Sequence, residues 1–183
     1  REHADFSDCY CTSNPEVRAF LIRWIDEYRE LFGPLRFFHL GGDEAYRFGS
    51  CPVCSARDRM ELYAEHIGAL AAGLIAAGVR PGIWCDMIMA HPQRLDVIPR
   101  DFLIWDWNYN DGLEPPRSVR VWGRGTITRD AVTPELLRDL PGLVDAAGEL
   151  NAFHASHTLV RNGFDVVLCS TARSAADGPI TPM

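Results

Sequence analysis

Residues 37–44 read Phe-Phe-His-Leu-Gly-Gly-Asp-Glu, an apolar run that ends in two glycines and two adjacent carboxylates. The apolar run predicts a short β-strand over residues 35–40. Consecutive side chains of a regular strand point to opposite faces of the sheet. Glycine reaches backbone angles that other residues avoid, so Gly41 and Gly42 allow the chain to leave the strand pleat. We therefore expect Asp43 and Glu44 to share one cavity.

The adjacency of the two acids points to a chemistry. Two carboxylates in one cavity repel each other, which favours one protonated and one ionised group. A proton donor beside an ionised carboxylate is the pair that cleavage of a glycosidic bond uses. The alternative for an Asp-Glu dipeptide is a solvated turn, but the strand, the two glycines and His39 favour a functional site.

Outside this segment, the sequence alternates between helical and strand-like patterns. Apolar spacing and capping residues predict helices over residues 15–32, 56–77, 134–140 and 151–162. Further apolar runs predict strands over residues 82–85, 102–105 and 164–169. This alternation indicates an α/β fold with a parallel sheet and helical connections. The strands are apolar nearly throughout, which predicts that both faces of the sheet are covered.

Polar and aromatic residues follow the ends of the predicted strands. They are Asp43 and Glu44, then Asp86, then Asp106, Trp107 and Tyr109, then Ser170 and Arg173. The carboxyl ends of parallel strands carry the functional site in α/β folds, so these residues predict a site at that edge. The alternative is that strand ends are polar because they meet solvent.

The composition excludes several classes of function. The 183 residues carry a net charge of −7, and all 18 basic residues are Arg. A surface this acidic disfavours nucleic acid and anionic membranes, and the lack of Lys excludes Schiff-base chemistry and a P-loop lysine. The longest apolar stretch, residues 67–79, is shorter than the ~20 residues that cross a bilayer. No segment has the pattern of a secretory signal, so we expect a cytoplasmic protein.

The segment from His39 to Glu44 matches the H-x-G-G-D-E signature of family 20 glycoside hydrolases, the β-N-acetylhexosaminidases. The continuation Ala45–Cys54 is similar to the branch that contains hexosaminidase D and bacterial N-acetyl-β-glucosaminidases. The resemblance extends through Trp84 and residues 105–107. It implies a (β/α)₈ barrel, of which residues 1–183 form a partial catalytic domain with about strands four to seven and their helices.

The resemblance also implies a mechanism. These enzymes retain anomeric configuration without a protein nucleophile, because the 2-acetamido oxygen of the substrate attacks the anomeric carbon and forms an oxazolinium ion. Glu44 would protonate the leaving oxygen and then act as base toward water. Asp43 would orient the acetamido group and stabilise its charge. His39 would support the carboxylates by hydrogen bonding, or would be a core histidine with satisfied hydrogen bonds.

Further substrate-binding residues follow from the same resemblance: Trp84, Asp86, Trp105, Trp107 and Tyr109. The tryptophans would form the apolar wall of the sugar pocket, with core packing as the alternative. Asp86 or Asp106 would bind sugar hydroxyls, or would be a solvated or capping carboxylate. Family members carry a Tyr after the seventh strand, where residues 170–174 have none, and Tyr109 is the candidate substitute.

Four cysteines form a C-x-C pair and a C-x-x-C pair: Cys9, Cys11, Cys51 and Cys54. This spacing is compatible with a structural zinc site, although C-x-C is a less usual half of such a site. Reduced thiols and a disulfide are the alternatives. No other cofactor is expected.

Three functional hypotheses remain open from the sequence. The first is a retaining β-N-acetylhexosaminidase that acts on terminal β-linked GlcNAc or GalNAc of glycans or glycoconjugates. The second is a non-catalytic sugar-binding or interaction fragment of a degenerate barrel, and the third is a metal-stabilised module. Strand edges that lack a neighbour would allow self-association in each case.

Overall fold

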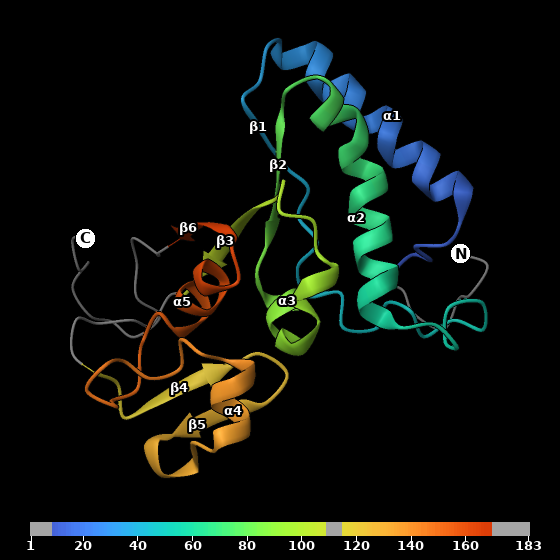
Figure 1. Cartoon of the computed structure of the whole chain (residues 1–183). Coiled ribbons are helices and arrows are strands. Elements are labelled where there is room, and N and C mark those ends of the chain that lie inside the picture. Colours follow the sequence, from blue (N-terminus) through green and yellow to red (C-terminus); the bar gives the residue numbers. More distant parts are fainter. Residues whose placement is uncertain (1–8, 109–114, 170–183) are drawn as a thin grey trace, which may run out of the picture. The chain divides into compact units, whose positions relative to one another are not determined.

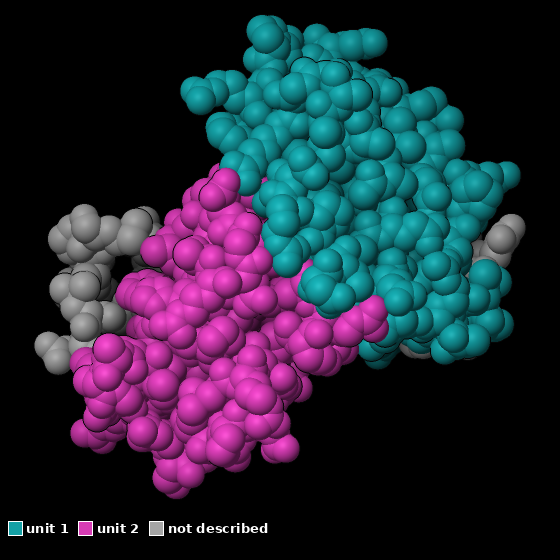
Figure 2. Space-filling model, viewed as in Figure 1, with its two compact units in different colours: residues 1–83, 96–102 teal, residues 84–95, 103–183 magenta. Residues whose placement is uncertain are grey.

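The computed structural model describes residues 9–108 and 115–169 (Figure 1). Helices alternate with strands, and the strand pairs β1–β2 and β3–β6 are parallel, which confirms the predicted α/β class. The described residues separate into two compact units (Figure 2): unit 1 has residues 9–83 and 96–102, and unit 2 has residues 84–95, 103–108 and 115–169. No helix in this part of the chain has the length and apolar character that crossing a membrane requires.

Unit 1 begins with helix α1, Pro15–Phe32, as predicted. The Asn14 side chain accepts a hydrogen bond from the backbone N–H of Glu16 at 2.9 Å, and Gly33 ends the helix. Helix α1 packs beside helix α2 (Figure 1), but no residue of α1 is buried. Four of its aromatic rings are at least 40% exposed and contact each other at four-residue intervals: Phe20, Trp24, Tyr28 and Phe32.

Strand β1, Phe37–His39, and strand β2, Arg80–Trp84, are connected through helix α2, Arg59–Ala76. The strands pair from Phe37 opposite Arg80 to His39 opposite Gly82. Helix α2 begins three residues later than predicted, because the Asp58 side chain caps it by accepting from the backbone N–H of Glu61. The apolar face of α2 forms much of the core of unit 1: Leu62, Ile67, Leu70, Ala71 and Leu74 are buried.

Unit 2 has a parallel strand pair and a smaller antiparallel sheet. Strand β3, Leu103–Trp107, pairs along its whole length with strand β6, Asp165–Cys169. Helix α5, His154–Arg161, packs on β6. The smaller sheet consists of strands β4 (Ser118–Val121) and β5 (Gly125–Thr128). Two short helices, α3 (Asp86–Met89) and α4 (Pro134–Asp139), and a 3₁₀ segment, Arg129–Ala131, also belong to unit 2. A second 3₁₀ segment, Pro92–Val97, begins in unit 2 and ends in unit 1.

Two features differ from the sequence expectation. Strands β4 and β5 form an antiparallel hairpin that was absent from the predicted order of elements. The prediction that all strands are covered on both faces holds for the buried strands β2 and β3, but it is wrong for β1 and β6. Phe37 of β1 is 49% exposed and Leu168 of β6 is 47% exposed, because the described residues of each unit place no cover over these side chains.

Candidate active site

The chain leaves the strand pleat directly after β1. The Leu40 N–H still donates to the Gly82 carbonyl at 2.8 Å, and then Gly41 and Gly42 have φ angles of 76° and 83°. Glu44 has a φ of 49° and is the one non-glycine residue with positive φ among the residues described. A left-handed backbone at a residue with a side chain costs roughly 1–3 kcal/mol and persists where the surroundings enforce it.

Asp43 and Glu44 line the same cavity of unit 1, which is the arrangement that the glycine pair predicts. The cavity has a volume of about 230 Å³ and is lined by Cys9, Tyr10, Thr12, Leu40, Gly42, Asp43, Glu44, Ala45, Phe48, Tyr63, His66, Ile67 and Leu70. Both carboxylate residues remain exposed. Ligand pockets usually enclose roughly 300–1,000 Å³, so this cavity is smaller than a typical ligand pocket.

Two side chains hold the glycine turn in place. The Tyr63 hydroxyl of α2 donates to the Gly42 carbonyl at 3.1 Å. The Gly41 N–H donates to His39 Nδ1 at 3.0 Å, so the ring proton of neutral His39 lies on Nε2. Partial burial lowers the pKa of His39, although the negative charge of Asp43 acts to raise it. His39 thus supports the backbone between the strand and the acids, and its contact with substrate stays a prediction.

Several residues of the cavity wall were not predicted from the sequence, chiefly Tyr10, Thr12, Tyr63 and His66. Thr12 Oγ1 and His66 Nδ1 are buried and have no hydrogen-bond partner among the described residues. Unsatisfied polar atoms at a cavity are places where water or a hydroxyl-bearing ligand binds. A signal for two of these residues exists in the sequence, because Tyr63 and His66 interrupt the apolar face of α2.

His66 is 6% exposed, and the Tyr10 hydroxyl lies 3.0 Å from its Nε2. Burial lowers the pKa of His66 to about 4, and the nearby Arg18 adds to this effect while Glu65 opposes it. The folded state therefore keeps His66 neutral at pH values where an unfolded chain, with a pKa near 6.5, binds the proton.

We expect His66 to make the stability of unit 1 depend on pH. Because the pKa is lower in the folded state, the unfolded state takes up the proton first, and stability is lost as pH falls from about 6.5 to about 4. The loss amounts to at most about 3 kcal/mol. NMR titration should place the His66 ring transition near pH 4, and His66→Gln should weaken the pH dependence of urea unfolding. A matched change at the exposed His157 should leave that dependence unchanged; an equal effect of both variants would contradict the assignment.

The predicted tryptophans and Asp86 all belong to unit 2. The rings of Trp84 and Trp105 meet edge to face, with centroids 6.1 Å apart. Asp86 is fully buried and accepts a hydrogen bond from Trp107 Nε1 at 3.4 Å. In this structure the Asp86 carboxylate thus positions an indole ring, and its predicted contact with sugar hydroxyls stays a prediction. Tyr109 and residues 170–174 lie outside the described residues.

Unit 2 has its own cavity of about 240 Å³, which Trp107 borders and Trp84 and Trp105 do not. The ring of Trp122 lies 4.8 Å from that of Trp107 and was not predicted as a site residue. Asp106 at this cavity is 1% exposed and accepts from Ser156 Oγ at 2.5 Å and from Cys85 Sγ at 3.3 Å. Its carboxylate is therefore satisfied within the protein.

Three of the four paired cysteines come together in unit 1: Cys11, Cys51 and Cys54. Cys9 is not a member of this cluster and instead lines the cavity that holds Asp43 and Glu44. Burial raises the pKa of the Cys11 thiol to about 11, and the neighbouring thiols add to the rise. Burial also acts to raise the pKa of Cys51, but hydrogen bonds from the Cys54 N–H and the neighbouring thiols outweigh it and lower that pKa.

Neither protein-family models nor curated protein sequences match the chain. Solved structures, in contrast, are similar to the chain. Dispersin B is 17% identical with a TM-score of 0.53, and the match covers 90% of this chain and 37% of that one. A β-N-acetylhexosaminidase from Bacteroides fragilis is 18% identical with a TM-score of 0.53, covering 95% and 28% of the two chains.

A third similar structure contains a family 20 catalytic module of StrH, the pneumococcal exo-β-D-N-acetylglucosaminidase. It is 18% identical with a TM-score of 0.51, and the match covers 92% of this chain and 34% of that one. At this identity the likeness shows a shared fold. The chain spans about a third of the length of the three proteins.

Proposed function

We propose that the chain contributes the acid pair of a glycoside hydrolase that removes terminal β-linked N-acetylhexosamine from glycans or glycoconjugates. The observation that carries this proposal is the left-handed turn at Gly41 and Gly42, after which Asp43 and Glu44 line one cavity. The folds of the similar structures support it, since two of them are named as a β-N-acetylhexosaminidase and an exo-β-D-N-acetylglucosaminidase. We place the chain in the hexosaminidase D-like branch, as part of a (β/α)₈ barrel.

The two acids divide the reaction between them. Glu44 protonates the glycosidic oxygen as the bond to the anomeric carbon breaks, while the acetamido oxygen of the substrate forms a bond to the same carbon. Asp43 accepts the acetamido N–H and stabilises the positive charge of the resulting oxazolinium ion. Glu44, now ionised, removes a proton from the water that reopens the ring, so the product keeps the β configuration.

The neighbouring residues fix the geometry of this pair. Tyr63 holds the Gly42 carbonyl and His39 holds the Gly41 N–H, so the backbone before the acids is tied at two successive residues. Within unit 2, Trp107 and Trp122 border a separate cavity with the kind of apolar surface that packs against a sugar face. A sugar-binding protein without turnover is the second candidate, favoured by Thr12 Oγ1 and His66 Nδ1 at the cavity, which have no partner in the described part of the chain and where a ligand hydroxyl would bind.

Two further expectations belong to this proposal. The exposed Phe37 on β1 favours self-association through that strand. Nucleic acid and membrane surfaces remain unfavourable partners for a chain with a net charge of −7.

Hydrolysis of p-nitrophenyl N-acetyl-β-glucosaminide tests the proposed function. We expect the intact protein to release p-nitrophenol and to give the β anomer of the free sugar first, as seen by proton NMR. The p-nitrophenyl β-glucoside lacks the acetamido group and should be cleaved far more slowly. Binding of an oxazoline mimic without any turnover would instead favour the sugar-binding candidate.

A further inference from the structure

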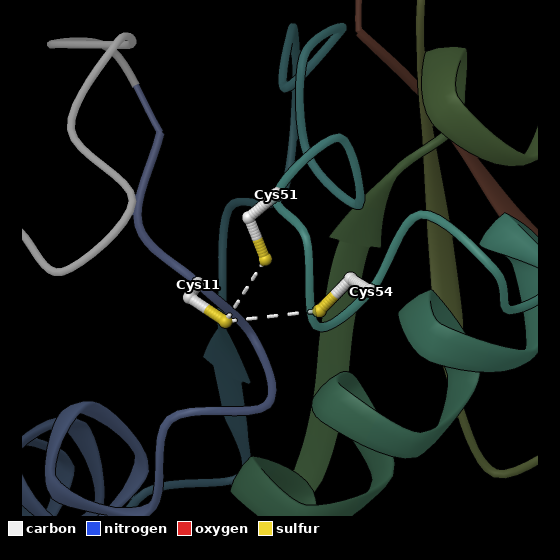
Figure 3. Close-up of side chains that lie close together, drawn as sticks. All are labelled: Cys11, Cys51 and Cys54. Atoms are coloured by element: carbon white, nitrogen blue, oxygen red, sulfur yellow. Dashed lines mark hydrogen bonds between the residues drawn. The ribbon is translucent and has the colours of Figure 1, made fainter.

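The cysteine cluster of unit 1 brings three sulfur atoms from two distant segments together (Figure 3). Cys11 Sγ lies 3.6 Å from Cys51 Sγ and 3.7 Å from Cys54 Sγ. All three sulfurs lie within 4.8 Å of one another, and Cys54 is buried. Cys11 precedes helix α1, while Cys51 and Cys54 belong to the loop between the acid pair and α2.

Tight turns present these sulfurs. The backbone N–H groups of Cys54 and Ser55 both donate to the Cys51 carbonyl, at 3.0 and 2.9 Å. The Asn14 N–H donates to the Cys11 carbonyl at 3.1 Å, which forms a turn before α1. Both halves of the cluster are therefore fixed by local backbone hydrogen bonds, so a ligand would not have to order them.

The two distances from Cys11 Sγ match edges of a zinc tetrahedron. With Zn–S bonds of about 2.3 Å and tetrahedral angles, two sulfur ligands lie about 3.8 Å apart. A disulfide requires sulfurs about 2.05 Å apart, and it would use two of the three thiols and leave the third unexplained. Thiolate is a soft ligand that suits zinc better than magnesium or calcium.

We propose that Cys11, Cys51 and Cys54 bind a structural Zn²⁺ ion as thiolates, with each thiol releasing its proton to solvent on binding. Three protein ligands leave one position of the tetrahedron, and Cys9 is the next thiol along the same segment. The inference does not depend on the proposed catalytic function, because it rests on the sulfur positions alone.

Such a site would fix two segments that line the cavity of Asp43 and Glu44. Cys9, Tyr10 and Thr12 line one part of the cavity, and Gly42 to Ala45 and Phe48 line another. Cys11 lies within the first of these segments, and Cys51 and Cys54 follow the second. A zinc ion would join the two segments through metal–sulfur bonds, where a hydrogen bond from Cys54 Sγ to Ser13 Oγ at 3.2 Å already links them.

Metal analysis and thiol chemistry on the purified chain, prepared without chelator or reductant, test this inference. We expect about one zinc ion per chain. Cys11, Cys51 and Cys54 should resist alkylation by iodoacetamide until 1,10-phenanthroline removes the metal, as mapped by peptide mass spectrometry. Thiols that become reactive only after a phosphine reductant would show a disulfide, and thiols that react without either treatment would show free cysteines. Either result would overturn the inference.

Variants and cobalt provide independent readouts. Cys51→Ser and Cys54→Ser should each weaken zinc binding by more than roughly tenfold. Cys169→Ser, on β6 of unit 2, should retain the zinc content of the parent chain. If the loop variants do not fold, Co²⁺ added to the metal-free parent chain decides the question. Intense absorption bands of a tetrahedral cobalt-thiolate centre are expected, and the weak spectrum of hydrated cobalt would contradict the site.

Discussion

Glu44→Gln should lower kcat/KM of the intact protein for N-acetyl-β-glucosaminides by roughly 10²–10⁴-fold. Glutamine has nearly the same shape as glutamate, but it neither gives a proton to the leaving oxygen nor takes one from water. Because p-nitrophenol leaves easily without a proton, the loss should be larger for substrates with an alkyl aglycone. The measurement is steady-state kinetics on both kinds of substrate, with circular dichroism to verify the fold.

Glu30→Gln is a suitable control, since Glu30 is an exposed residue of helix α1. It removes the same charge from unit 1 and should leave kcat/KM unchanged. A Glu44→Gln protein that turns over both substrates at the parent rate would remove Glu44 from the reaction. An equal loss for the two aglycones would leave Glu44 without a role as proton donor.

Gly42→Ala should disturb both the fold of unit 1 and the placement of the acids. Gly42 has a φ of 83°, and a Cβ atom there would lie 2.6 Å from the Tyr63 hydroxyl oxygen. The left-handed backbone costs a residue with a side chain about 1–2 kcal/mol, and overpacking adds about 1–3 kcal/mol. A shift of the acids by about 1 Å would lower turnover by about 10²-fold. Urea unfolding and kinetics measure the two effects.

Two companion variants separate the two causes. Gly33→Ala introduces a side chain at a φ of 74°, but no atom lies within 4 Å of the new Cβ, so it reports the backbone cost alone. The double variant Gly42→Ala/Tyr63→Phe removes the hydroxyl that the new methyl would meet. It should be more stable than the sum of the two single changes predicts. If the stability changes of the two single variants simply add in the double variant, contact with the Tyr63 hydroxyl is not the cause of the stability lost in Gly42→Ala.

Local sequence rules predicted most of the helices and strands, and also the departure of the chain from the strand before Asp43 and Glu44. Asn14 and Gly33 define helix α1 because capping and chain reversal depend on the residues at the ends. The start of α2 was also readable, since Asp58 and Glu61 form a capping signature at the observed helix start. The two glycines predicted that the chain leaves the strand pleat, and the structure shows that it does so through the positive φ angles that few other residues adopt.

Other features depend on contacts that local rules do not see. The β4–β5 hairpin has strands of four residues, and alternation over Val119 and Val121 is too short a pattern to distinguish from a loop. The aromatic stripe of α1 predicted a helix correctly, but its exposure depends on which elements pack beside it. Tyr10 and His66 meet at the cavity from positions 56 residues apart, so neither residue has a local signal for that contact.

The most direct test of the acid pair compares p-nitrophenyl N-acetyl-β-glucosaminide with p-nitrophenyl β-glucoside, using the intact protein and Asp43→Asn. If Asp43 acts on the acetamido group, the parent protein should prefer the acetamido substrate strongly, and Asp43→Asn should lose most of that preference while keeping its fold. A parent protein that cleaves both substrates equally, or a folded Asp43→Asn protein with an unchanged preference, would contradict the assignment.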